Sequence, residues 1–346
     1  MSERYAQPSQ EKTLGPRLGR RLVGATALAA LATCPSAQAI PEATSQYQPP
    51  SINIVHDHNE CPDDTQFGVL NVPGVGLSTV GEHAAAVSRD ILDDDFDECS
   101  AGLVYGSEYN SYENTKQLAK FIDDNQIDTV LIYAHSFGGI AAVDMVSKYY
   151  DKYPDDDTKF AIAFFSSPDG SDSLPFFSRA MTQFHGNFPV NDSWIHVETY
   201  LSTAAQKNTV FFDEQTALAV VENAQNTPSS LVYTQSRRLL QGMGQLPENK
   251  DIPLYFIGDE RDSVVDTVRA PEAIEQKTGK SIQEVIYMTY SDLLMSAHAG
   301  LWWRDYVEDN RRPVVTVTRL SLDALGARAK KPATMSSGSK LTAQPR

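Results

Sequence analysis

Short apolar runs alternate with amphipathic stretches through the first half of the chain. The runs have the length and composition of buried β-strands, and they lie at 51–55, 67–72, 102–105, 128–133 and 159–165. Several intervening stretches carry apolar residues at the spacing of a helix, namely 82–92, 112–125 and 139–150. Continuous apolar strands that alternate with helices are typical of a parallel sheet covered on both faces, so the pattern predicts an α/β fold.

The alternation breaks after residue 170, where no convincing strand pattern occurs for about 75 residues. Four helix-like segments, each after a polar start, fill this part of the chain. They lie at 173–185, 193–206, 214–225 and 229–242. Strand character resumes at 252–257, so these helices interrupt one sheet. We therefore predict a helical cap at 171–248, inserted into an α/β core formed by 51–170 and 249–326.

The N-terminus has the pattern of an export signal. Arg20 and Arg21 precede an apolar stretch at 22–33, and Ala37-Gln38-Ala39 follows as a small-x-small cleavage site. The pattern predicts a signal peptide over 1–39, because the apolar stretch is shorter than the ~20 residues that span a bilayer. Twin-arginine export, an uncleaved anchor and a lipoprotein-type signal are the alternatives. We expect an exported protein, periplasmic, at the cell surface or extracellular, without stable membrane insertion after cleavage.

Amino-acid composition limits the kinds of binding partner and the cellular compartment that fit the chain. The formal charge of −16 argues against nucleic acid, which binds basic surfaces. The segment 40–50 is interpreted as an extended leader and 327–346 as a disordered basic tail.

Once 1–39 is removed, the cysteines that remain are Cys61 and Cys99. Two cysteines in an exported chain predict one disulfide, with two separate thiols as the alternative.

The stretch 132–139 reads Ile-Tyr-Ala-His-Ser-Phe-Gly-Gly and joins a predicted strand to a predicted helix. A serine hydroxyl needs a base, an orienting acid and oxyanion donors before it acts as a nucleophile. A sharp strand-to-helix turn presents such a hydroxyl clear of the backbone, and that strained turn needs small flanking residues. Ala134 and Gly138 flank Ser136, and Gly139 lets the following helix pack closely. The stretch therefore predicts a nucleophile elbow.

At these residues the chain resembles the α/β-hydrolase family, whose elbow reads G-x-S-x-G. The resemblance covers about 66–310 and implies a mostly parallel, doubly wound sheet with an inserted helical cap. It makes Ser136 the nucleophile, with Ala134 in place of the first glycine of the motif. His135 is interpreted as a structural or pocket-lining residue, because adjacent side chains on a tight turn diverge.

The resemblance also implies the remaining triad residues. The family's histidine precedes a C-terminal helix, and His298 in Ser-Ala-His-Ala-Gly-Leu fits that place. The family's acid follows a late strand in the pattern G-x-x-D-x-x-V. Asp262 keeps the D-x-x-V spacing but has one extra residue after the glycine, and Asp169, after the run at 159–165, is the alternative acid. The order Ser136, Asp262, His298 is the order of this fold.

The oxyanion loop of the family is often written H-G-x-G. The chain has Pro73-Gly-Val-Gly76 at this place, without the histidine. By resemblance, the backbone N–H groups of Phe137 and of Gly74 or Val75 would hold the oxyanion.

The predicted chemistry is hydrolysis of a carboxylic ester through a Ser-His-Asp triad and an acyl-enzyme. The partner would be a small-molecule ester or amide, and the mechanism needs neither a metal nor an organic cofactor. His56 and His58 resemble part of a metal cluster, but a solvated loop is the better interpretation because further paired ligands are missing. The alternatives are an aminopeptidase- or amidase-type hydrolase of the same fold and a non-catalytic binding protein that keeps the fold.

Overall fold

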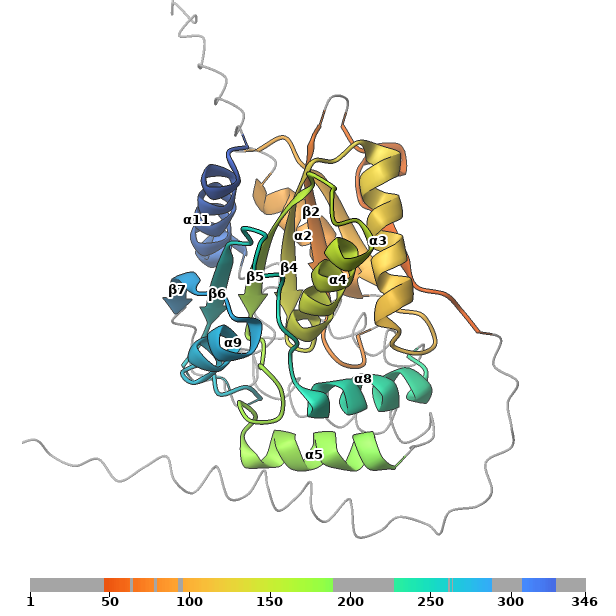
Figure 1. The fold of residues 1–346 in the computed structure, drawn as a ribbon, viewed down its shortest axis with the longest axis vertical. Coiled ribbons are helices and arrows are strands. Elements are labelled where there is room, and N and C mark those ends of the chain that lie inside the picture. Colours follow the sequence, from red (N-terminus) through yellow and green to blue (C-terminus); the bar gives the residue numbers. More distant parts are fainter. Residues whose placement is uncertain are drawn as a thin grey trace, which may run out of the picture. The chain divides into compact units, whose positions relative to one another are not determined.

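A computed structural model gives the fold of the chain (Figure 1). The structure describes residues 47–62, 65–77, 80–92, 96–188, 227–260, 262, 264–287 and 307–327, and every structural statement below concerns these residues. The predicted signal peptide at 1–39 lies outside them, as do the predicted helices at 193–206 and 214–225 and nearly all of the predicted tail at 327–346.

The order of strands and helices follows the predicted alternation. The strands are β1 (Ser51–Ile54), β2 (Phe67–Val72), β3 (Cys99–Val104), β4 (Thr129–His135), β5 (Lys159–Phe165), β6 (Leu254–Gly258) and β7 (Ile282–Tyr287). The helices are η1 (Asp57–Asn59), α2 (Val80–Leu92), α3 (Ser111–Asn125), α4 (Gly138–Lys152), α5 (Phe176–Asn187), α8 (Ser229–Gln241), α9 (Ala270–Thr278) and α11 (Val307–Leu325). Within the described ranges, no helix combines the length and the apolarity that crossing a bilayer requires.

One sheet with the strand order β1-β3-β2-β4-β5-β6-β7 organises the fold. β1 runs antiparallel to β3, and every other pair of neighbouring strands is parallel. β2, β4 and β5 are buried along nearly their whole length, as central strands are when both faces of a sheet are covered. The predicted mostly parallel, doubly wound sheet is confirmed.

Side chains along β4 alternate between two apolar layers. Val130, Ile132 and Ala134 belong to the apolar cluster that includes α3 and α4. Leu131 and Tyr133 belong to the cluster on the other face, which includes α2 and α11. This period of two is the geometry of a strand covered on both sides, and Figure 1 shows α3 and α4 side by side along the sheet.

The predicted disulfide between Cys61 and Cys99 is present. It joins the segment after η1 to the first residue of β3, across a sequence separation of 38 residues. The two Cα atoms lie 4.9 Å apart, within the range usual for disulfides. The bond therefore ties the chain next to the edge strand β1 to the body of the sheet.

Between β5 and β6 the structure describes two helices, α5 and α8, which pack against each other. Leu231 and Leu239 of α8 are buried in the same apolar cluster as Ile140 of α4. α8 therefore covers part of the core. The extent of the cap at 171–248 stays a prediction, since 189–226 lies outside the described residues.

Candidate active site

Ser136 occupies the turn between the carboxyl end of β4 and the start of α4. Its backbone has φ 54°, in the left-handed region that residues other than glycine adopt at an energetic cost. The Ser136 N–H donates to the carbonyl oxygen of Phe165 at 2.9 Å, which fixes the turn against β5. The serine is half-buried, although its neighbours in the chain are buried. This strand-turn-helix geometry is the one that a nucleophile elbow requires, and the role of Ser136 as a nucleophile stays a prediction.

The glycines after Ser136 are required by close packing. A Cβ added to Gly138 would collide with the carbonyl oxygen of Val72 in β2. A Cβ added to Gly139 would lie 2.7 Å from the Cβ of Ser167. Larger side chains at these two positions would push the first turn of α4 away from the sheet, so the glycines let the helix start directly behind the serine.

Two chain segments meet at the Ser136 side chain. A Cβ added to Gly74, in the loop between β2 and α2, would lie 3.0 Å from the Ser136 Cβ and 3.4 Å from its Oγ. Val75 follows on this loop and is half-buried. Phe137 caps the N-terminus of α4 and has a fully buried side chain. The predicted oxyanion donors therefore come from segments next to the serine, and the use of their N–H groups stays a prediction.

Asp262 follows β6 at the carboxyl edge of the sheet, the edge at which Ser136 follows β4. Its side chain is 9% exposed, and Oδ1 accepts the N–H groups of Val264 at 2.8 Å and Val265 at 3.1 Å. These contacts hold the carboxylate in a tight turn. His298 lies outside the described residues, so its pairing with Asp262 stays a prediction.

Asp169, the alternative acid, is 1% exposed in the segment after β5. Its Oδ1 accepts the Ser173 N–H at 3.2 Å and the Ser173 hydroxyl, and its own N–H donates to Ser173 Oγ at 3.0 Å. The Asp169 carbonyl oxygen accepts the N–H of Met243 at 2.6 Å. In each candidate acid, one carboxylate oxygen thus accepts hydrogen bonds from residues just after it in the chain. The Asp169 carbonyl oxygen also binds the chain after α8.

Comparison with solved structures identifies the fold, whereas no protein-family model matches the chain and no curated sequence gives a significant match. A lipase-esterase related protein from Clostridium acetobutylicum superposes with a TM-score of 0.50 at 13% identity, over 77% of this chain and 98% of that chain. The meta-cleavage product hydrolase from Pseudomonas fluorescens superposes with a TM-score of 0.50 at 13% identity, over 79% of this chain and 94% of that chain. The chain has the α/β-hydrolase fold.

Two histidines that the sequence analysis named, His135 and His56, contact strands of the sheet. His135, the last residue of β4, is 3% exposed, and its ring lies 6.3 Å from that of Phe165. His56 accepts the N–H of Ser100 at its Nε2 at 2.8 Å, which commits this nitrogen to the backbone of β3. Within the part of the chain that the structure describes, no group of three or more His, Cys, Asp or Glu side chains is arranged to hold a metal ion.

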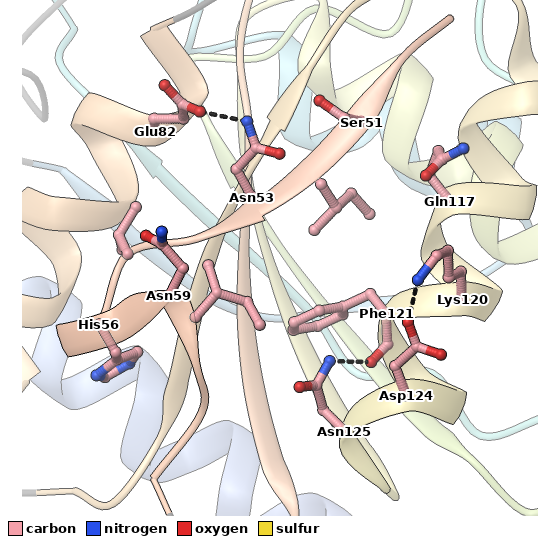
Figure 2. Close-up of a pocket in the computed structure, with 13 residues that line it drawn as sticks. Ser51, Asn53, His56, Asn59, Glu82, Gln117, Lys120, Phe121, Asp124 and Asn125 are labelled. Carbon is pink, nitrogen blue, oxygen red and sulfur yellow. Dashed lines mark hydrogen bonds and ion pairs between the residues drawn. The ribbon is translucent and has the colours of Figure 1, made fainter.

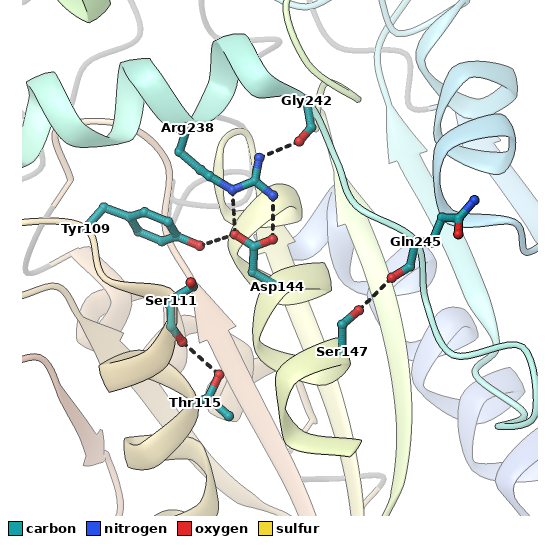
Figure 3. A network of polar contacts seen from close by, with 8 residues as sticks. All are labelled: Tyr109, Ser111, Thr115, Asp144, Ser147, Arg238, Gly242 and Gln245. Atoms are coloured by element: carbon teal, nitrogen blue, oxygen red, sulfur yellow. Dashed lines mark hydrogen bonds and ion pairs between the residues drawn. The ribbon is translucent and has the colours of Figure 1, made fainter. Parts of the chain in front are cut away.

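A buried polar network that the sequence did not reveal joins α8 to α4 (Figure 3). Arg238 donates from Nε to Asp144 Oδ2 at 2.8 Å and from Nη2 to Oδ1 at 2.5 Å. The Tyr109 hydroxyl donates to Asp144 Oδ2 at 2.6 Å, and the Tyr109 ring meets Phe137 edge to face at 5.0 Å. Burial, and then the negative charge of Asp144, raise the pKa of Tyr109 well above its ordinary value, so the hydroxyl keeps its proton. The network fixes α8 against the helix that begins at the elbow.

A groove of about 890 Å³ lies away from the elbow, along the edge strand β1 (Figure 2). Its lining is mixed, and Ile52 and Ile54 contribute beside polar side chains. The amide of Asn53 donates to Glu82, and the amide of Asn125 donates to the Phe121 carbonyl oxygen at 2.8 Å. Ser136 does not line the groove. The groove is therefore separate from the candidate active site.

Proposed function

We propose that the chain is a serine hydrolase that cleaves small carboxylic esters through a covalent acyl-enzyme. The observation that carries the proposal is the position of Ser136, held at φ 54° between a buried strand and a helix with Gly74 against its side chain. Strain of this kind persists where the surrounding structure holds it, and it gathers at functional sites. Two of the solved proteins that share the fold are named for lipase-esterase and hydrolase chemistry, which supports the same reaction class.

In the proposed mechanism the Ser136 Oγ attacks the carbonyl carbon of the ester while His298 takes the hydroxyl proton. The carbonyl oxygen becomes an oxyanion, which the N–H groups of Phe137 and of Gly74 or Val75 stabilise. His298 then gives its proton to the leaving alcohol as the C–O bond breaks. Water attacks the acyl-enzyme by the same route, which releases the acid and restores the serine.

Asp262 is the proposed acid that orients His298 and stabilises its charged form. Its place after β6 supports this role, because the carboxyl ends of β4 and β6 lie at the same edge of the parallel sheet. The spacing from Asp262 to Val265 also keeps the pattern of the family's acid turn.

We also propose that the protein is exported. The signal pattern over 1–39 supports export, and so does the disulfide between Cys61 and Cys99, because disulfides persist in oxidising compartments. The proposed cap at 171–248 would then set the substrate preference of the site around Ser136.

The test is active-site labelling followed by a substrate panel. A fluorophosphonate probe is expected to modify the wild-type protein at Ser136, and Ser136→Ala is the control that should remain unlabelled. Nitrophenyl esters of increasing acyl length and aminoacyl nitroanilides then separate esterase from aminopeptidase activity. Faster cleavage of nitroanilides would assign the aminopeptidase alternative. Absence of labelling and of all hydrolysis would leave a non-catalytic binding protein.

A further inference from the structure

Side chains from distant parts of the chain hold the loop between β2 and α2. The Tyr105 hydroxyl donates to the carbonyl oxygen of Pro73 at 2.9 Å. The Thr227 hydroxyl donates to the carbonyl oxygen of Gly76 at 3.0 Å. The Gly76 N–H in turn donates to Gln235 Oε1 at 2.9 Å. Both polar backbone groups of Gly76 are therefore bound by the segment that contains α8.

The Gln235 amide is buried without being fully satisfied. The side chain is 0% exposed, and among the described residues its Nε2 has no hydrogen-bond partner. The orientation of the amide follows from the contact with Gly76, because only the oxygen can accept an N–H. A buried donor without a partner lowers stability. An apolar side chain of similar size would remove this donor but would leave the Gly76 N–H without its acceptor, so the glutamine adds little net stability. Stability alone therefore does not account for a glutamine here.

We propose that Gln235 is a positioning residue for the oxyanion loop, an inference that rests on the proposed serine-hydrolase function. Gly76 lies two residues beyond Gly74 and has φ 70°, so the contact with Gln235 fixes a left-handed turn at the end of the loop. That turn sets the direction of the peptide groups of Gly74 and Val75, which are the proposed donors. Preorganised donors stabilise the transition state, and a small displacement of such groups lowers the rate.

The matched variants are Gln235→Met and Thr234→Val. Gln235→Met keeps the length of the side chain but removes the acceptor for Gly76. Thr234→Val removes a different contact of α8, the hydrogen bond that Thr234 Oγ1 accepts from the Tyr109 N–H at 2.8 Å. For ester hydrolysis we expect Gln235→Met to lower kcat about 10-fold, less than the 10²–10³-fold that loss of an oxyanion donor itself costs.

The other readouts separate positioning from packing. In Gln235→Met, KM should stay within about twofold of the wild-type value. Tm should change little, because removal of the unsatisfied Gln235 amide offsets the loss of the acceptor for the Gly76 N–H. Thr234→Val should keep kcat near the wild-type value. Thr227→Val removes the second contact to Gly76, and we expect it to lower kcat without raising KM, which provides an independent test should Gln235→Met fail to fold.

The outcomes distinguish this inference from the proposed function. A wild-type protein that is neither labelled by the fluorophosphonate nor active on any ester overturns the proposed function, and the positioning role falls with it. An active wild-type enzyme with unchanged kcat in Gln235→Met, or in Thr227→Val where the first variant does not fold, overturns the positioning role alone. Equal losses of kcat in Gln235→Met and Thr234→Val also overturn it, since Gln235 would then only help to dock α8.

Discussion

The buried ion pair between Asp144 and Arg238 tests how α8 is held against the core (Figure 3). The side chains are 10% and 18% exposed, and the guanidinium contacts both carboxylate oxygens. Arg238→Met removes the charge but keeps most of the aliphatic chain, which leaves Asp144 buried with the Tyr109 hydroxyl as a donor. Breaking one side of a buried pair costs about 3–5 kcal/mol, and we expect about 3 kcal/mol because Tyr109 still satisfies one oxygen.

Removing both charges should cost much less than removing one. In the double variant Asp144→Leu/Arg238→Met no unpaired charge stays buried, so we expect a loss of only about 1 kcal/mol in the free energy of unfolding. Urea denaturation of the wild type, both single variants and the double variant gives the coupling energy. It should be at least about 2 kcal/mol, because Arg238→Met alone costs about 3 kcal/mol and the double variant about 1 kcal/mol. Single-variant losses that add up to the double-variant loss within ~0.5 kcal/mol would refute the pairing. The exposed pair of Lys120 and Asp124 is the control, and Lys120→Met should change stability little.

Three further predictions concern the triad acid, the disulfide and the elbow. Asp262→Asn should lower kcat on the best ester by up to ~10⁴-fold, the loss that the same change causes in a serine-protease triad. Asp169→Asn should lower kcat far less. The reverse ranking would assign the role of the acid to Asp169. Cys61→Ala opens a loop spanning 38 residues and should lower the free energy of unfolding by up to about 4 kcal/mol in urea under oxidising conditions, so an unchanged midpoint would contradict a stabilising disulfide. Gly138→Ala should abolish fluorophosphonate labelling and cost about 1–3 kcal/mol by overpacking, whereas Gly244→Ala, with open space at its Cβ, should label normally.

Local patterns were enough to predict the central strands, the strand-turn-helix at Ser136 and the disulfide. Each of these depends on an apolar run, on a motif of adjacent residues or on a pair of rare residues. β7 was not predicted, because most of its residues are exposed and they form no continuous apolar run. The contacts of Gly76 with Gln235 and of Asp144 with Arg238 were missed for a different reason. They join residues 159 and 94 positions apart, and no local spacing indicates such a partner.

α8 shows why a run of helices does not by itself define a detachable cap. Its residues Leu231 and Leu239 are 0% and 4% exposed within the core cluster, and Gln235 is bound to the loop beside the elbow. Replacing all of 171–248 with a short linker should therefore uncover the core and abolish fluorophosphonate labelling, with aggregation as a further consequence. Replacing only 189–226 keeps these contacts, and we expect that variant to retain its circular dichroism and its labelling while substrate preference changes. If the longer replacement stayed folded and labelled like the wild type, α8 would be dispensable, and its contacts with the loop and the core would contribute little to either.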